Sequence, residues 1–195
     1  MCYNSKVLKK LIKGDIKMAD INFLDYTPEI AAEKTIRLLK SMNLTIASAE
    51  SCTGGLISEL ITSVPGASDV FELGICTYSE RMKNKFLGVS SEEIEKYGVV
   101  SEQVAKSMVS GLKECSSADI CVSVTGVAGP GGGTKEKPVG TVYLGFDICG
   151  KQFVCLPELW KLADRSRNNI RRSAAAYAFA FIETKLLETE QKDER

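Results

Sequence analysis

The chain has 195 residues, 44% of them hydrophobic, and its 25 basic and 25 acidic side chains give a formal net charge of zero. These values favour one compact domain and argue against nucleic acid as a partner, and the lack of a long apolar run or secretory signal predicts a cytoplasmic protein without a membrane partner. The absence of histidine excludes Ser-His-Asp and Cys-His catalysis and any imidazole-bound metal.

Residues 1–22 contain five lysines and little apolar periodicity. We therefore expect a flexible N-terminal extension, then one domain over residues 23–187 and a charged tail over residues 188–195. A threonine followed by a proline, at residues 27–28, is typical of a helix start, because threonine caps the helix and proline suits its first position. The apolar positions that follow predict a helix that ends near Asn43.

The rest of the chain alternates between apolar runs of strand length and helical patterns. The expected strands lie at residues 44–49, 70–78, 118–125, 139–148 and 151–156. The expected helices begin near residues 56, 79, 90, 101 and 167, and the last ends near residue 187. Because most of the strands are apolar on both faces, we predict an α/β fold: a three-layer α/β/α sandwich around a mixed, mostly parallel sheet.

Ser51 stands between a predicted strand and a predicted helix. Unpaired helix N–H groups and the positive end of the helix dipole favour an anion at such a position. The serine is therefore either a nucleophile whose oxyanion is held by backbone N–H groups or the N-cap of the helix. Cys52 is a rival nucleophile, but without histidine its activation would depend on the dipole or a lysine, and packing is the simpler interpretation.

A serine nucleophile needs a base, and without histidine a neutral lysine is the natural choice. Tyr78 and Lys83 lie five residues apart, just past a predicted strand. They come near each other if a helix begins at Ser79. The alternative is a half-buried tyrosine and a solvated lysine, and these residues alone do not decide between the two.

Six of the sixteen glycines fall within residues 126–140. Glycines let a backbone approach a ligand closely, so this loop either binds phosphate or is a long flexible hairpin. Its spacing fits neither a Walker A loop nor a dinucleotide-binding turn.

The last predicted helix opens with a group of arginines, although cations at a helix N-terminus oppose the dipole. An anionic ligand would account for them, since guanidinium and helix N–H groups can share a phosphate or carboxylate. The alternative is partial neutralisation by Asp164 and Glu158 on a wet surface. The arginines are Arg165, Arg167, Arg171 and Arg172.

Five segments, taken together and in order, resemble the C-terminal domain family of the competence/damage-inducible protein CinA. They are residues 49–55, 77–83, 98–101, 124–132 and 137–142. Stand-alone members of that family are nicotinamide-nucleotide amidohydrolases. The resemblance therefore implies hydrolysis of nicotinamide mononucleotide to nicotinate mononucleotide and ammonia, a step that recycles NAD in the pyridine nucleotide cycle.

The resemblance also implies roles for individual residues. It makes Ser51 the nucleophile and Lys83 its general base, with Tyr78 alongside. Spacing aligns Arg167 with the arginine of the family, although Arg165 stays open because the usual neighbours are replaced. The candidate substrate-binding residues are Thr53, Gly54, Gly55, Thr125, Gly126, Gly129 and Arg167.

We expect a small-molecule nucleotide as ligand, no cofactor and no metal, and we leave a homo-oligomer open. The chain contains no match to the larger N-terminal domain of full-length CinA proteins, so the resemblance predicts the deamidase activity alone. A second hypothesis is a non-catalytic nucleotide-sensing module that keeps the pocket. Ammonia release from nicotinamide mononucleotide separates the two.

Overall fold

The structure, a computed structural model, describes residues 27–193, so the extension expected over residues 1–22 lies outside the described residues. The helices are α2 (Pro28–Met42), α3 (Leu56–Thr62), α4 (Glu80–Leu87), α5 (Ser91–Tyr97), α6 (Glu102–Ser116) and α7 (Arg167–Asp193). The strands are β1 (Ile46–Glu50), β2 (Phe71–Cys76), β3 (Ile120–Gly126), β4 (Val142–Ile148) and β5 (Lys151–Cys155). Two short 3-10 helices, η2 (Ala67–Asp69) and η3 (Leu159–Lys161), complete the described elements.

The five strands form one sheet in the order β2-β1-β3-β4-β5. Strand β1 pairs in parallel with β2 and β3, whereas β4 pairs antiparallel with both β3 and β5. Strand β4 therefore runs against the direction shared by the other four. The predicted mixed and mostly parallel sheet is confirmed.

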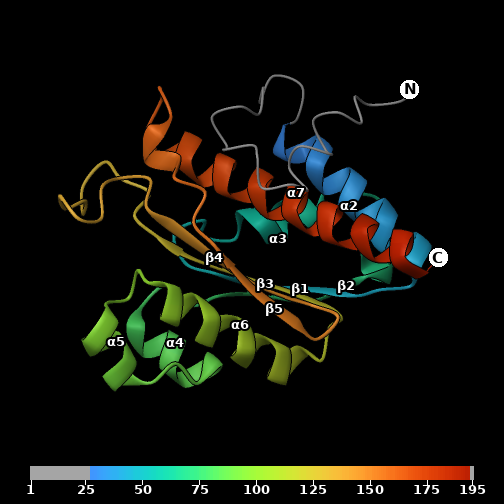
Figure 1. Ribbon diagram of the computed structural model, residues 1–195, viewed down its shortest axis with the longest axis horizontal. Helices are drawn as coiled ribbons and strands as arrows, with labels where there is room; N and C mark the ends of the chain where they lie inside the picture. The colour runs from blue at the N-terminus through green and yellow to red at the C-terminus, as the bar shows by residue number, and fades with distance from the viewer. Residues whose placement is uncertain (1–26, 194–195) are drawn as a thin grey trace.

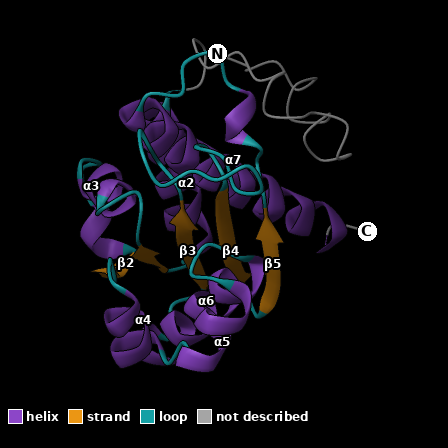
Figure 2. Ribbon diagram, turned by 90° about the vertical axis from the view of Figure 1, so that its left-hand side faces the viewer, coloured by secondary structure: helices purple, strands orange, loops and turns teal. Residues whose placement is uncertain are grey.

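Helices cover both faces of the sheet, which confirms the three-layer sandwich. Helices α2, α3 and α7 lie on one face and α4, α5 and α6 on the other (Figure 1), and the turned view in Figure 2 shows the same separation. Because side chains alternate across a strand, each buried strand contributes to two cores. In β1, for example, Ile46 joins the core under α2, α3 and α7, whereas Ala47 and Ala49 join the core under α4 to α6.

Local capping explains where several helices begin. The Thr27 hydroxyl accepts a hydrogen bond from the Ile30 N–H at 3.4 Å, and proline follows it at the first helical position, as the sequence predicts. Ser79, Ser90 and Ser101 cap α4, α5 and α6 in the same way. Each cap satisfies a helix N–H group that has no partner within its own helix.

The structure differs from the sequence-based expectation at the end of the chain. Helix α7 continues to Asp193 instead of ending near residue 187. The segment is rich in glutamate, glutamine and lysine, which favour helix, and a Lys185–Glu188 ion pair of 2.9 Å supports this turn. The strand expected at 139–148 also begins later, at Val142, because the Thr141 N–H closes a turn onto the Pro138 carbonyl.

The parallel pairing of β2, β1 and β3 brings the carboxyl ends of these strands to one edge of the sheet. Those ends are Cys76, Glu50 and Gly126, respectively. In open α/β sheets, ligands bind outside the carboxyl ends of the strands. The segments that follow these three strands carry the side chains described next.

Candidate active site

The Ser51 hydroxyl and the Lys83 amine are in direct contact. Ser51 is the first residue after β1, and Lys83 lies on α4, which follows β2. The Lys83 Nζ donates to the Ser51 Oγ at 2.9 Å, and the lysine is fully buried while the serine is 9% exposed. The alternative of a solvated lysine at this position is therefore wrong.

Lys83 has two further partners, the carbonyl oxygens of Thr77 at 2.7 Å and Tyr78 at 3.4 Å. An ammonium group has three N–H donors, and each can be assigned to one of the three oxygen atoms around it. When the amine loses a proton, its two remaining N–H groups can stay on the carbonyls. Its lone pair then faces the Ser51 hydroxyl, which is the arrangement that a base needs.

Burial makes the neutral form of this amine accessible near neutral pH. Loss of hydration disfavours the charged form and lowers the pKa of Lys83 from 10.5 to about 8, against smaller opposing effects from Cys52 and Glu80. With that pKa, roughly a quarter of the amines are neutral at pH 7.5. An exposed lysine would be almost entirely charged at the same pH.

Cys52 has the opposite character. Its side chain is 6% exposed, and burial raises the pKa of its thiol to about 12. The thiolate, which is the nucleophilic form of cysteine, is therefore scarce at neutral pH. The interpretation of Cys52 as a packing residue agrees with its place in the core under α2, α3 and α7.

Ser51 is not the N-cap of helix α3. The helix begins at Leu56, and its N-cap is Gly55 in a left-handed conformation with φ of 94°, without a side-chain cap. The carboxyl group of Glu50 accepts the helix donors instead. It takes the N–H groups of Gly55 and Ile57 at 3.0 Å each and that of Ser58 at 2.9 Å. The Ser51 hydroxyl is thereby left for Lys83.

Glu50 is a site residue that the sequence reasoning missed. It is fully buried, and it also accepts the Ser58 hydroxyl at 2.8 Å. The available signal was a carboxylic acid at the end of a fully buried strand, immediately before a turn and a helix. An acidic group at a helix N-terminus is favourable because its negative charge complements the helix dipole and its oxygen atoms accept hydrogen bonds from the free N–H groups.

Replacing Glu50 with alanine is expected to lower the free energy of unfolding by about 3 kcal/mol or more, because several buried N–H donors lose their acceptor together. Urea unfolding followed by circular dichroism measures the change. The matched control is Glu59→Ala, an exposed residue on α3, the helix whose N–H groups Glu50 accepts, which we expect to change stability by less than about 0.5 kcal/mol. Equal stabilities of the two variants would contradict this role of Glu50.

The backbone of the turn after β1 offers a small set of donors for an oxyanion. The Gly54 N–H donates to the Ser51 carbonyl at 3.0 Å, and the Gly55 N–H is taken by the carboxyl group described above. Within residues 27–193, no acceptor is assigned to the N–H groups of Cys52 and Thr53. These two are therefore the candidate oxyanion donors nearest to Ser51 in the chain.

The remaining groups of the turn hold it against helix α7. The Thr53 carbonyl accepts from Arg171 Nε at 3.0 Å and Nη2 at 2.6 Å, while its buried hydroxyl makes no hydrogen bond to the described chain. The predicted substrate-binding residues Thr53, Gly54 and Gly55 do not line the cavity beside Ser51. The structure gives them a scaffolding position in the turn.

A cavity of about 380 Å³ lies beside Ser51. Five of the predicted site residues line it, together with several residues that were not predicted. Its lining residues are Ser51, Cys52, Tyr78, Ser79, Glu80, Val99, Val100, Thr125, Gly126, Ala128 and Arg167. A volume of this size suits a small organic ligand.

Tyr78 and Arg167 meet at the wall of this cavity. Arg167 donates to the Tyr78 hydroxyl at 3.0 Å and to the Gly129 carbonyl at 2.7 Å. The tyrosine is 61% exposed, and its hydroxyl bonds the arginine rather than Lys83, which contacts only its carbonyl. Of the two candidate arginines, Arg167 lines the cavity and Arg165 does not.

The other arginines of α7 have protein partners. Arg172 pairs with Glu29 of α2 at 2.7 Å. Among residues 27–193, neither Asp164 nor Glu158 forms an ion pair with an arginine: Asp164 accepts bonds from its own loop, and Glu158 pairs with Lys161. No ion pair within the described residues supports the alternative of surface neutralisation by these two acids.

Thr125 and Gly126 bring the end of β3 to the cavity. The Thr125 hydroxyl donates to the Val99 carbonyl at 2.8 Å, which ties β3 to the segment before α6. A Cβ on Gly126 would lie 2.8 Å from atoms of Val142 and from the Thr141 carbonyl, so only glycine fits this position. Both residues line the cavity, as the resemblance implies.

The glycine-rich loop connects two antiparallel strands, β3 and β4, and is therefore a hairpin connection. Only its first residues, Gly126 and Ala128, reach the cavity. Lys137, near its other end, donates to the Tyr97 and Val100 carbonyls at 3.1 and 2.7 Å. Gly129 contributes a carbonyl to Arg167 and so positions that arginine.

No group of three or more acidic or thiol side chains is placed to hold a metal ion in the part of the chain that the structure describes. The six described cysteines are all free. No helix within residues 27–193 is long and apolar enough to cross a membrane.

The fold and the site define an α/β sandwich protein that holds a serine hydroxyl against a buried lysine amine at the carboxyl edge of its sheet. The sequence model of the CinA C-terminal domain matches residues 29–186 of the chain. The protein belongs to this family, as the sequence motifs indicate.

Relatives and solved structures agree with that membership. A CinA-like protein of Thermotoga maritima is 45% identical over 141 residues, which cover 72% of this chain and 35% of that protein. The CinA-like protein of Kosmotoga olearia is 46% identical over 159 residues, or 82% of this chain and 38% of that protein. The chain thus spans little more than a third of the length of these relatives.

Two solved structures have the same fold. The crystal structure of competence/damage inducible protein CihA from Agrobacterium tumefaciens has a TM-score of 0.75 at 36% identity, and the match covers 80% of this chain and 93% of that one. A CinA superfamily protein from Escherichia coli has a TM-score of 0.76 at 29% identity, with 82% and 91% covered.

Proposed function

We propose that this protein hydrolyses the carboxamide of nicotinamide mononucleotide and releases nicotinate mononucleotide and ammonia. The observation that carries the proposal is the 2.9 Å contact between the Ser51 hydroxyl and the buried amine of Lys83, in a chain without histidine. An amide is the substrate class that a serine nucleophile with an amine base can cleave. The choice of this particular amide rests on the resemblance of the five sequence motifs.

In the first half of the reaction, neutral Lys83 accepts the Ser51 proton while the Oγ attacks the carboxamide carbon. The bond between oxygen and carbon forms, and the carbonyl electrons move onto its oxygen. The protonated lysine then donates to the amide nitrogen, the carbon–nitrogen bond breaks, and ammonia leaves. The product of this half is an ester between Ser51 and the nicotinoyl group.

In the second half, water takes the place of the serine as the attacking group. Lys83 accepts a proton from that water as it adds to the ester carbon. Collapse of the second tetrahedral intermediate breaks the ester bond, and the proton returns from the lysine to the Ser51 oxygen. The carboxyl group of the nicotinate product carries the oxygen atom of that water. The enzyme returns to its starting state without any cofactor.

The backbone N–H groups of Cys52 and Thr53 are the proposed donors to the oxyanion. Comparable donors contribute roughly 3 to 4 kcal/mol each to transition-state stabilisation. Buried backbone donors suit this task because they need little reorganisation during the reaction. The contact of Arg171 with the Thr53 carbonyl supports the proposal, since it holds the turn in place.

Arg167 is the proposed partner of the ribose phosphate. Its guanidinium group lines the cavity and is positioned by the Tyr78 hydroxyl and the Gly129 carbonyl. Guanidinium groups bind phosphate in a bidentate manner, which fixes orientation as well as position. Of the glycines in residues 126–140, Gly126 then shapes the cavity wall, and Gly129 supports Arg167.

Ammonia release from nicotinamide mononucleotide by the purified protein tests the proposal. We expect turnover with the mononucleotide, and weak or no turnover with nicotinamide or its riboside, because these lack the phosphate. A coupled glutamate dehydrogenase assay measures the ammonia. Binding of the mononucleotide without ammonia release would instead establish the non-catalytic nucleotide-binding module.

A further inference from the structure

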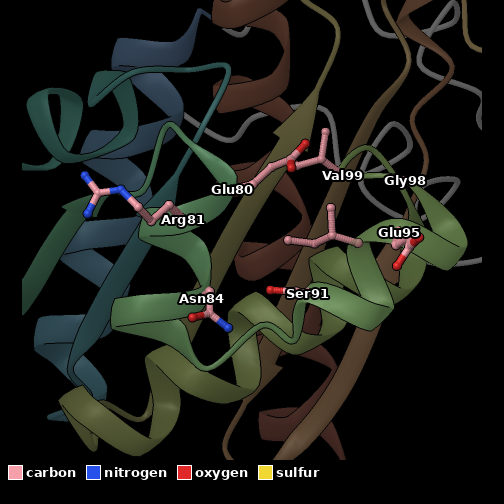
Figure 3. Close-up of a pocket in the computed structure, with 8 residues that line it drawn as sticks. Glu80, Arg81, Asn84, Ser91, Glu95, Gly98 and Val99 are labelled. Carbon is pink, nitrogen blue, oxygen red and sulfur yellow. The ribbon is translucent and has the colours of Figure 1, made fainter.

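Glu80 lies between the cavity beside Ser51 and a second groove. It is the first residue of α4, and it lines the cavity beside Ser51 together with Val99. The same two residues line an adjoining groove of about 570 Å³ between α4 and α5. Figure 3 shows the Glu80 carboxyl group directed toward Val99, whereas the Arg81 side chain points away from both.

The Glu80 carboxylate forms no ion pair or hydrogen bond with another described side chain, and its charge acts on the buried Lys83 amine only as a smaller effect that raises the pKa of that lysine. Arg167, on the same cavity, is likewise free of any acidic partner within residues 27–193 and bonds only neutral oxygens. The cavity therefore presents one unpaired negative group and one positive group with neutral partners. A ligand that carries both signs of charge would match this distribution.

The aromatic ring of Tyr78 adds a third feature. It is 61% exposed and lines the cavity two residues before Glu80. Its hydroxyl accepts a hydrogen bond from Arg167, and its ring is an apolar group of the cavity that Glu80 also lines. Aromatic faces attract cations and stack on planar rings.

We propose that Glu80, with the ring of Tyr78, is a specificity-determining residue that recognises the positive charge of an N-substituted pyridinium ring. The inference rests on the proposed function, and it assigns the two charged ends of that substrate to two walls of the cavity. The pyridinium ring meets Glu80 and Tyr78, and the phosphate meets Arg167. A neutral ring of the same size loses the electrostatic contribution of Glu80 to binding and keeps the contacts with Tyr78 and Arg167.

A simpler role for Glu80 is to stabilise the start of α4, because an acidic residue there favours the helix dipole. That role does not depend on the charge of any ligand. The two roles therefore differ in one measurable respect, which is whether Glu80 distinguishes a cationic ring from a neutral one.

The experiment measures binding to Ser51→Ala protein, which cannot consume the amide, by titration calorimetry. The two ligands are nicotinamide mononucleotide, with a cationic ring, and its 1,4-dihydro form, with a neutral ring. Adding Glu80→Gln is expected to weaken binding of the cationic ligand by about two- to fivefold, the range for an exposed charge pair. Binding of the neutral ligand should stay unchanged.

The matched control is Glu95→Gln, because Glu95 lines the outer groove and not the catalytic cavity. We expect this variant to keep the preference for the cationic ligand. Equal binding of both ligands to the parent protein, or a preference that survives Glu80→Gln, would overturn the inference. So would equal weakening of both ligands by Glu80→Gln, which would assign the residue to the helix start.

The binding result is independent of turnover, so the inference and the proposed function can fail separately. Protein that prefers the cationic ring through Glu80, but releases no ammonia with Ser51 intact, would retain the inference and overturn the amidase activity. Protein that releases ammonia, but whose preference for the cationic ring survives Glu80→Gln, would retain the amidase activity and overturn the inference. Absence of binding to either ligand would overturn the inference.

Discussion

Replacing Ser51 with alanine is expected to lower kcat/KM for nicotinamide mononucleotide by roughly 10³-fold or more, since a covalent route ends when its nucleophile is removed. Ligand binding should persist, because the other lining residues of the cavity, Arg167 among them, are unchanged. Steady-state ammonia release measures the first quantity and titration calorimetry the second. Retained stability in urea would show that the loss is chemical rather than structural.

The control for this variant is Cys52→Ala, which removes the rival nucleophile next in the chain. Because burial raises the pKa of the Cys52 thiol to about 12, we expect this protein to keep most of its activity. The assignment of Ser51 fails if the serine variant still turns over substrate, or if the cysteine variant is the one that becomes inactive.

Replacing Lys83 with methionine should lower kcat by roughly 10²- to 10⁴-fold, the usual contribution of a positioned general base. Methionine approximates the apolar part of the side chain but has no amine to accept the Ser51 proton. Lys83→Arg should not restore activity, because a guanidinium group keeps its proton at all accessible pH values. Single-turnover measurements with both variants separate the chemical step from binding.

The pH profile provides a second measurement on Lys83. The pKa of this amine is lowered to about 8, and only the neutral form accepts a proton. In the unmodified protein, kcat/KM should therefore rise by about tenfold per pH unit below that value and become level above it. The methionine variant should lack this rise in its residual activity.

The matched control for the lysine variants is Lys85→Met, an exposed lysine two residues further along α4. We expect it to retain full activity and the same pH profile. A profile that falls with pH in the range where Lys83 loses its proton would contradict the role of the neutral amine. Loss of activity in Lys85→Met would assign the loss of activity in the Lys83 variants to the net charge of α4 instead of to the missing base.

Much of the secondary structure was predictable from neighbouring residues. The capping positions at Thr27, Ser90 and Ser101 are confirmed, and so is the order of strand, turn and helix around Ser51. These features depend on interactions within about four residues, which a sequence displays directly. The predicted end of α7 near residue 187 is wrong, because the charged residues that follow it favour helix.

The site was predictable only in part. The motifs indicated the serine and the lysine, but the local pattern left Ser51 open as a nucleophile or a helix cap, and Lys83 open as a base or a solvated surface residue. The structure instead gives the helix donors to Glu50 and buries the lysine completely. Nor did the pattern reveal that Glu80 faces the cavity, since its position at a helix start has a sufficient local explanation.

The sequence by itself determined which chemistry was available: without histidine, a serine nucleophile had to depend on another base, and Lys83 was one of few candidates near a strand end. Only the tertiary structure decided that this amine meets a hydroxyl 32 residues away. It did so through the parallel pairing of β1 and β2, which brings the two chain segments to the same edge. Burial among distant segments then lowers the pKa of the amine, and burial is a property of the packed molecule rather than of any local pattern.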